Sequence, residues 1–240
     1  MTMIDFHNAK LLGDIRAHAA AEYPKEACGI VAAGQYVPMT NVADDPLHDF
    51  RISERALLPY DVEAVVHSHP DGPDEPTAGD MRSQMSMDVP FGLCVSHDGS
   101  AGLPWFWGGV PSVPLLGRPF RHGPSGTDGR GDCYALVKDW YAQERGVELP
   151  EFPRDNDWWR SGGNLYEEGF ALAGFRAVQT GAEPQTGDVA LITVPRSDVV
   201  NHAAVYIGDG LIFHHLYNRL SAREPAGRWA EHVVRWVRHD

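Results

Sequence analysis

The stretch AVVHSHPDGPDEPTAGD, residues 64–80, carries the strongest structural signal in the chain. It opens with an apolar, β-branched run that predicts a buried strand ending at His69. Side chains at positions i and i+2 of a strand point to the same face, so His67 and His69 can both reach one ion. Thr77 is a favourable helix N-cap, and Asp80 then lies in the first turn of the helix that follows.

This spacing predicts a zinc site. Two imidazole nitrogens and one carboxylate oxygen, from His67, His69 and Asp80, form a three-ligand site whose fourth position is open to water. A zinc-bound water has a pKa of about 7, and its proton still needs an acceptor. Glu26, in the upstream segment PKEACG, is the candidate for that base. A lone histidine is more often an ordinary surface or core residue, so the prediction depends on the complete motif.

These residues resemble the motif of the JAMM (Mov34/MPN/PAD-1) metallopeptidases, and the likeness runs over residues 1 to about 108. It implies Zn²⁺ on His67, His69 and Asp80, with Glu26 as general acid/base. It also implies that Thr77, where the family usually has serine, helps to hold the developing oxyanion. Members of this family cleave peptide or isopeptide bonds.

A second candidate site begins at Cys133, where a helix is predicted to start. The N-terminal end of a helix carries about half a positive charge. We therefore expect the pKa of this thiol to be lowered, as a nucleophile requires. His202 starts a predicted strand and is the candidate base. His214, on the next predicted strand, can orient that base, which gives the Cys-His-His form of the nucleophile–base–orienter arrangement.

The same residues allow other interpretations. A buried cysteine with two strand histidines, or a second metal site, would also account for Cys133, His202 and His214. His215 directly follows His214, and alternation on a strand lets only one of the two face the site. The twelve-residue step from His202 favours His214.

With GDVALI just upstream of His202, residues 115 to about 238 resemble the NlpC-type cell-wall peptidases, which are papain-like. The resemblance implies catalysis by Cys133, His202 and His214 on peptidoglycan stem peptides, usually at the γ-D-glutamyl–diamino-acid bond. One position departs from the pattern. Relatives often carry a tyrosine upstream of the cysteine that lends its hydroxyl to the oxyanion, and Phe120 has none.

A break in composition separates the two motifs. Residues 110–131 read VPSVPLLGRPFRHGPSGTDGRG, a proline- and glycine-rich run typical of a linker or long loop. We expect two α+β domains, at residues 1–110 and 115–240, each with helices beside a largely antiparallel sheet. By resemblance, the first has the JAMM/MPN fold and the second a papain-like NlpC-type fold.

The composition excludes several classes of protein. A net charge of −13 argues against binding to nucleic acid. No apolar run approaches the roughly 18 residues that span a bilayer, and the N-terminus lacks the features of a secretory signal. Three cysteines form no disulfide framework, and we expect Cys28 and Cys94 to be buried and inert. His48 and His97 are expected on the solvent side.

The order of the two domains within 240 residues resembles the tail assembly protein K family of lambda-like phages. This implies a tail-tip assembly protein with two peptidase sites. Its partners would be phage tail-tip proteins and peptidoglycan stem peptides, in the host cytoplasm during assembly or at the virion tail tip. Two alternatives remain: a structural tail-tip protein with vestigial sites, mildly favoured by Phe120, and a cellular JAMM-type de-conjugating protease, which the second domain disfavours.

Overall fold

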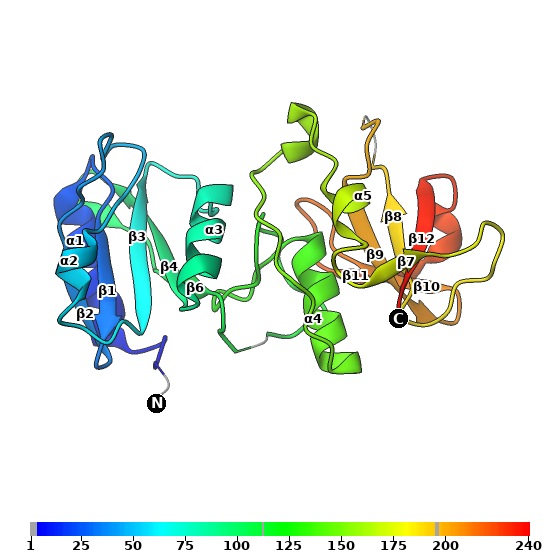
Figure 1. Cartoon of the computed structure of the whole chain (residues 1–240), viewed down its shortest axis with the longest axis horizontal. Coiled ribbons are helices and arrows are strands. Elements are labelled where there is room, and N and C mark those ends of the chain that lie inside the picture. Colours follow the sequence, from blue (N-terminus) through cyan, green and yellow to red (C-terminus); the bar gives the residue numbers. More distant parts are fainter. Residues whose placement is uncertain (1–3, 112, 195–196) are drawn as a thin grey trace. The chain divides into compact units, whose positions relative to one another are not determined.

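The structure is a computed structural model that describes residues 4–111, 113–194 and 197–240. The chain divides into two compact units (Figure 1). The first unit runs to Pro111 and also includes Gly126–Asp128, and the rest of the chain forms the second unit.

The first unit is built on a mixed sheet. Its elements are α1 (Ala9–Glu22), β1 (Cys28–Ala32), β2 (Gln35–Met39), α2 (Glu54–Leu57), β3 (Ala64–Pro70), α3 (Ala78–Met87), β4 (Phe91–His97), β5 (Ser100–Ala101) and β6 (Trp105–Trp107). The strand order is β2-β1-β3-β4-β5, with β6 also paired to β4. The pair β3–β4 is parallel, and the other pairs are antiparallel.

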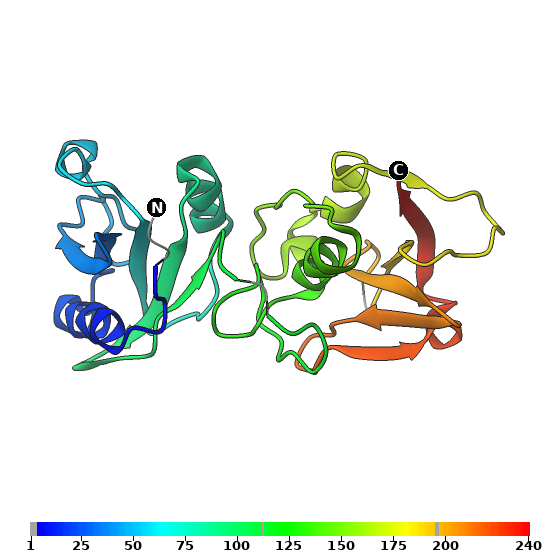
Figure 2. The same ribbon diagram turned by 90° about the horizontal axis from the view of Figure 1, so that it is seen from below.

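Alternation along β3 decides which way the histidines point. Helix α1 packs its apolar side chains on one face of the sheet, together with Val66 (Figure 2). Val65 belongs to the core on the opposite face. Since His67 and His69 follow Val65 with period two, both lie on the face away from α1. Phe50 covers this face in part, because its ring stacks on His67 with centroids 4.4 Å apart.

The second unit is an antiparallel sheet with helix α4 on one face. Its elements are α4 (Cys133–Arg145), η1 (Trp158–Ser161), α5 (Leu165–Gly169), β7 (Phe175–Ala177), β8 (Val189–Ile192), β9 (His202–Gly208), β10 (Leu211–His214), β11 (Ala222–Pro225), η2 (Ala226–Trp229) and β12 (Val233–His239). The strand order is β11-β10-β9-β8-β12-β7, and every pair is antiparallel.

Helix α4 buries an apolar side against the central strands of this sheet. Leu136, Val137 and Trp140 belong to one core with Val205 of β9. The opposite face holds a smaller core, against which Trp229 packs. The expected α+β architecture, with helices beside largely antiparallel sheets, is confirmed. Strand β12, which lies between β8 and β7 in this sheet, was not predicted.

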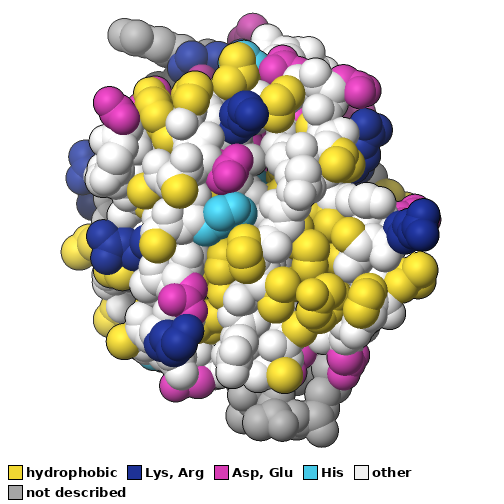
Figure 3. All heavy atoms as spheres, turned by 90° about the vertical axis from the view of Figure 1, so that its left-hand side faces the viewer, with side chains coloured by type: hydrophobic (Ala, Val, Ile, Leu, Met, Phe, Trp, Pro, Cys, Tyr) yellow, Lys and Arg dark blue, Asp and Glu magenta, His cyan; other side chains and the backbone are white. Residues whose placement is uncertain are grey.

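One part of the predicted linker belongs to the first unit. The backbone amide of Thr127 donates to the carbonyl oxygen of Phe106 at 2.9 Å, and its hydroxyl accepts from the Phe106 amide at 3.0 Å. Thr127 therefore anchors this part of the linker to β6. In the described ranges, no helix has the length and apolar character needed to cross a membrane. Figure 3 shows hydrophobic side chains interspersed with charged ones on one face of the molecule.

Candidate functional sites

Strand β3 and helix α3 bring three candidate ligand side chains together. The Nε2 atoms of His67 and His69 lie 3.2 Å apart. Asp80 Oδ1 lies 3.4 Å from His67 Nε2, and Asp80 Oδ2 lies 3.6 Å from His69 Nε2. All three residues are buried. Their ligand atoms converge within 4.8 Å, so this group could hold a metal ion.

These separations fit a zinc ion. Zinc binds histidine nitrogen and carboxylate oxygen at about 2.0–2.2 Å in tetrahedral geometry, which places neighbouring ligand atoms about 3.3–3.6 Å apart. The three observed separations, 3.2, 3.4 and 3.6 Å, lie at or close to that range. His69 Nδ1 lies 2.8 Å from the Pro73 carbonyl oxygen. Because a carbonyl only accepts, Nδ1 carries the hydrogen and the Nε2 lone pair is free for a metal.

Thr77 holds Asp80 in place. The two residues form a capping box at the start of α3, in which Asp80 N donates to Thr77 Oγ1 at 3.0 Å. The Thr77 hydroxyl in turn donates to Asp80 Oδ2 at 2.8 Å. Burial acts to raise the pKa of Asp80. The facing His67 and His69 and the Thr77 hydroxyl outweigh burial and hold this pKa well below its usual range.

Glu26 is a buried carboxyl beside this cluster. Its side chain is buried, and burial raises its pKa although His67 and His69 act in the opposite direction. A buried carboxyl whose pKa lies above its ordinary value is suited to the role of a general acid/base. The structure thus brings Glu26, Thr77 and the three predicted ligands into one region of the first unit.

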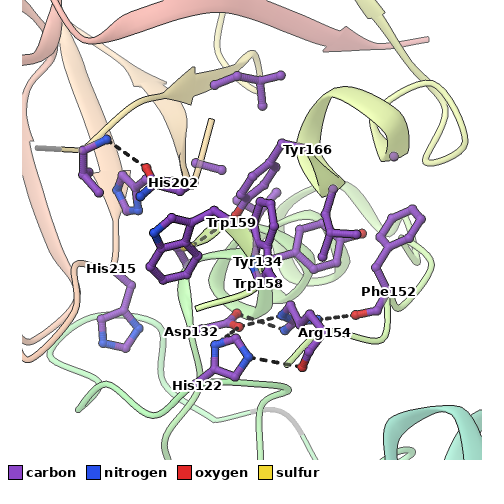
Figure 4. A pocket seen from close by; sticks show the side chains of 18 of the residues that line it. His122, Asp132, Tyr134, Phe152, Arg154, Trp158, Trp159, Tyr166, His202 and His215 are labelled. Atoms are coloured by element: carbon purple, nitrogen blue, oxygen red, sulfur yellow. Dashed lines mark hydrogen bonds and ion pairs between the residues drawn. The ribbon is translucent and has the colours of Figure 1, made fainter. Parts of the chain in front are cut away.

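The second unit contains a cavity of about 860 Å³ that Cys133 and His202 both line. Trp158, Trp159 and Tyr166 line it as well, and Figure 4 shows these three aromatic side chains close together. Such a volume is in the range of small-ligand pockets. The cavity is the natural place for a substrate of this unit.

The predicted histidine pair is present in the structure. His202 Nε2 lies 3.1 Å from His214 Nδ1. Glu224 Oε2 faces His214 Nε2 at 3.8 Å and also accepts a hydrogen bond from Trp229 Nε1 at 3.1 Å. Burial, followed by the neighbouring His214, lowers the pKa of His202 to about 3, so this imidazole is neutral at pH 7.

His215 departs from the sequence-based expectation. Strand β10 ends at His214, so strict alternation does not extend to the next residue. His215 lines the cavity, and its ring lies edge-on to Phe120 with centroids 5.2 Å apart. Both histidines therefore belong to the site region. His214 is the one paired with His202.

Asp132 fixes the start of α4, directly before Cys133. Its carboxylate accepts from Ala135 N at 2.9 Å as the N-cap and from Gly123 N at 3.0 Å. Arg154 adds two further bonds, from Nε at 2.7 Å and from Nη2 at 3.0 Å (Figure 4). Burial alone would raise the pKa of Asp132, but the charge and hydrogen bonds of Arg154 lower it to about 2. This buried ion pair anchors the helix end that presents the thiol.

Cys133 corrects one expectation. Its pKa was expected to be lowered by the helix end. Instead, burial and the negative charge of Asp132 raise it to about 11, although Tyr166, the Ala203 backbone and Arg154 act in the opposite direction. Among the described side chains, Tyr166 is the one that hydrogen-bonds to the sulfur, with Oη and Sγ 3.1 Å apart. The resting site therefore holds a neutral thiol and a neutral His202.

The predicted exposure of two histidines and burial of two cysteines are confirmed. His48 and His97 are exposed and each contacts a nearby aspartate. Cys28 and Cys94 are fully buried, and burial raises the pKa of each thiol to about 12. Phe120 lines the cavity and brings no hydroxyl to it.

Comparison with known proteins gives a family match for each unit. Residues 117–238 match the NlpC/P60 family, and residues 8–106 match the prokaryotic homologs of the JAB domain. The chain is 33% identical to tail tip assembly protein K of Escherichia phage N15, over 96% of this chain and 94% of that protein. The chain belongs to the tail tip assembly protein K family. The family's protein from Escherichia phage lambda is 38% identical over 77% of this chain and 85% of its own length.

Among solved structures, NlpC1 from Trichomonas vaginalis matches 52% of this chain and 39% of its own chain, with 18% identity and a TM-score of 0.37. The NlpC/p60 domain of the peptidoglycan hydrolase SagA matches 52% of this chain and 90% of that domain, with 17% identity and a TM-score of 0.34. Membership of the K family rests on the sequence matches and not on these two.

Proposed function

We propose that this chain assembles at a phage tail tip and carries two peptidase sites. The first is a zinc-dependent peptidase or isopeptidase in the first unit. The second is a Cys-His-His endopeptidase for peptidoglycan stem peptides in the second unit. One observation carries the proposal: Cys133 at the N-terminus of α4 and His202 line one cavity, and His202 is paired there with His214 behind it. The family's tail tip proteins supply the biological setting.

The histidine pair supports a direction for the proton. Glu224 attracts a hydrogen on His214 Nε2, which leaves Nδ1 of that ring as an acceptor for His202 Nε2–H. The Nδ1 lone pair of His202 is then available to take the thiol proton of Cys133. Because catalytic hydrogen bonds often tighten only when substrate binds, this transfer belongs to the substrate complex.

The covalent steps then follow ordinary thiol peptidase chemistry. The sulfur of Cys133 forms a bond to the scissile carbonyl carbon while the π electrons move to oxygen. The C–N bond breaks as the imidazolium of His202 returns its proton to the leaving nitrogen. Water, activated by the same imidazole, cleaves the thioester and restores the thiol.

In the first unit, His67, His69 and Asp80 would hold the zinc ion. The bound metal lowers the pKa of a water and polarises a substrate carbonyl. Glu26 would accept the proton of that water and deliver it to the leaving nitrogen. Thr77 orients Asp80 through its hydroxyl, and in this proposal the same hydroxyl would also donate to the developing oxyanion.

Incubation of the full chain with purified muropeptides tests the cysteine site. The wild type should release stem-peptide fragments that mass spectrometry identifies, and Cys133→Ser should release none. Thermal unfolding of the variant provides the folding control. If a folded, fully reduced wild type cleaves no muropeptide, the endopeptidase proposal fails, and the result would favour a structural role at the tail tip.

Elemental analysis tests the metal site separately. We expect close to one zinc per wild-type chain and none for His67→Ala. Glu26→Gln should retain the zinc and lose cleavage of tail proteins, because this residue acts as a base and not as a ligand. A wild type purified without chelators that contains no metal would overturn this half of the proposal.

A further inference from the structure

We infer that Tyr166 is a catalytic residue of the cysteine site, whose hydroxyl holds the Cys133 thiolate and then donates to the oxyanion of the acyl intermediate. This inference rests on the proposed endopeptidase function. The observation behind it is the 3.1 Å separation of Tyr166 Oη and Cys133 Sγ. Phe120, which we expect at the position from which relatives lend a hydroxyl, brings none to the cavity. The hydroxyl that reaches this sulfur comes from Tyr166 of α5, which follows Cys133 in the sequence.

The environment of Cys133 makes such a donor necessary. Burial and the Asp132 carboxylate both disfavour the thiolate. A hydroxyl that donates to sulfur stabilises the thiolate, because a hydrogen bond to the charged form favours that form. In the resting structure, either the thiol or the Tyr166 hydroxyl can be the donor of their shared bond. Once the thiolate forms, sulfur can only accept, so the hydroxyl is the donor.

The Tyr166 hydroxyl remains a neutral donor throughout the working pH range. Burial, followed by the nearby Cys133 and Asp132, raises the pKa of Tyr166 well above its ordinary value. The phenol therefore keeps its proton when a thiolate forms beside it. It does not compete with His202 as the base.

The ring of Tyr166 is held in position by aromatic contacts. Its centroid lies 6.4 Å from that of Tyr134 in an edge-on arrangement and 6.1 Å from that of Trp158. Tyr166 also packs against the core that α4 forms with the sheet. Figure 4 shows Tyr166 projecting from α5 toward the interior of the site. A donor fixed in this way needs little rearrangement when charge develops, which is the property of an effective oxyanion hole.

The atom that accepts the hydrogen bond from the Tyr166 hydroxyl changes as the negative charge moves during the reaction. In the thiolate, the negative charge is on sulfur and the Tyr166 hydroxyl donates to it. When sulfur bonds to the carbonyl carbon, the charge moves to the carbonyl oxygen, which is one atom beyond the bonded carbon. The hydroxyl can follow this charge by a small rotation of its hydrogen. No proton leaves the phenol at any step.

The test compares Tyr166→Phe with the wild type in the full chain. The first readout is the pH profile of iodoacetamide labelling of Cys133, measured by peptide mapping without substrate. The second is kcat and KM for muropeptide hydrolysis. Tyr206→Phe is the matched control, because it also removes one hydroxyl from the second unit and that residue lies outside the cavity lining.

Tyr166→Phe should displace the labelling profile to higher pH and slow labelling at neutral pH by about tenfold or more, the value of a hydrogen bond to a charged group. It should lower kcat by about 10²-fold with little change in KM, as removal of an oxyanion donor does. Tyr206→Phe should leave both readouts near wild type. The substitution leaves in place the other titratable residues that line the cavity, which are His122, Asp132, Tyr134, Arg154, Asp157, Arg160, His202, His215, Tyr217 and Arg219.

An unchanged labelling profile, or a kcat equal to or above that of the wild type, would overturn the inference, since the hydroxyl would then be a structural or blocking contact. The ring packing is retained in the variant, and its thermal unfolding midpoint checks this. A wild type that cleaves no muropeptide would count against the proposed function, whereas the labelling profile would still decide whether Tyr166 stabilises the thiolate.

Discussion

The buried ion pair of Asp132 and Arg154 makes the folding free energy of the second unit depend on pH. The pKa of Asp132 is lowered from an ordinary 3.8 to about 2 in the folded protein. A difference of one pKa unit corresponds to about 1.4 kcal/mol, so the ionised carboxylate contributes about 2 kcal/mol of folding free energy. Because the folded pKa is the lower one, this contribution is complete above about pH 5 and is lost as the pH falls toward 2.

The variant Asp132→Asn isolates this contribution. It keeps an oxygen that can cap α4 but removes the charge that faces Arg154. A buried charge that loses its partner destabilises a folded protein by about 3–5 kcal/mol. Between pH 5 and pH 3, linkage predicts that the wild type loses about 1 kcal/mol more stability than the variant does. Carboxylates outside this ion-pair network titrate alike in both proteins, so their contribution to the stability difference cancels. Glu151 is not one of them, because it also pairs with Arg154.

Urea titrations read by pulsed hydrogen exchange in α4 peptides measure the second unit within the intact chain. We expect the wild type to be the more stable protein at pH 7 and the gap to narrow in acid. Equal acid sensitivity of the two proteins between pH 5 and pH 3 would refute the assignment of a lowered Asp132 pKa, and with it the view that this ion pair anchors the nucleophile's helix.

Two further predictions concern the thiols and the domains. Iodoacetamide at neutral pH should label Cys133 before Cys28 and Cys94, because both of those are fully buried and burial raises each pKa to about 12; equal labelling in folded protein, found by peptide mapping, would contradict this. Fragments that end near Gly109 and begin near Leu115 should each unfold cooperatively in thermal melts, since each unit has an apolar core of its own; failure of both to fold alone would refute the proposed boundary.

The metal-site geometry could be predicted from local rules. A strand places His67 and His69 on one face, and a capping residue three positions before Asp80 fixes that carboxylate in the first helical turn. Each rule acts over a few residues, and helix α3 carries Asp80 as the connection between the parallel strands β3 and β4. The nucleophile's helix follows the same logic, because Asp132 is a favourable N-cap.

The parts that sequence reasoning missed depend on contacts between distant residues. Tyr166 lies 33 positions from Cys133 in a five-residue helix with no apolar periodicity, so no local pattern indicates their contact. Arg154 is likewise 22 positions from Asp132. The predicted lowering of the Cys133 pKa considered the helix end and omitted two opposing effects. The Asp132 carboxylate is visible in the sequence, whereas the burial of the thiol is revealed only by the folded structure.

The central claim is that one chain holds two chemically independent peptidase sites, and crossed inactivation tests it most directly. One preparation is treated with a zinc chelator, with iodoacetamide, or with neither, and is then given muropeptides together with tail-tip proteins. Mass spectrometry of the products should show that the chelator stops only the cleavage of tail proteins and that alkylation stops only muropeptide hydrolysis. Loss of both activities on chelation would contradict the account and would indicate a second metal site at Cys133, His202 and His214.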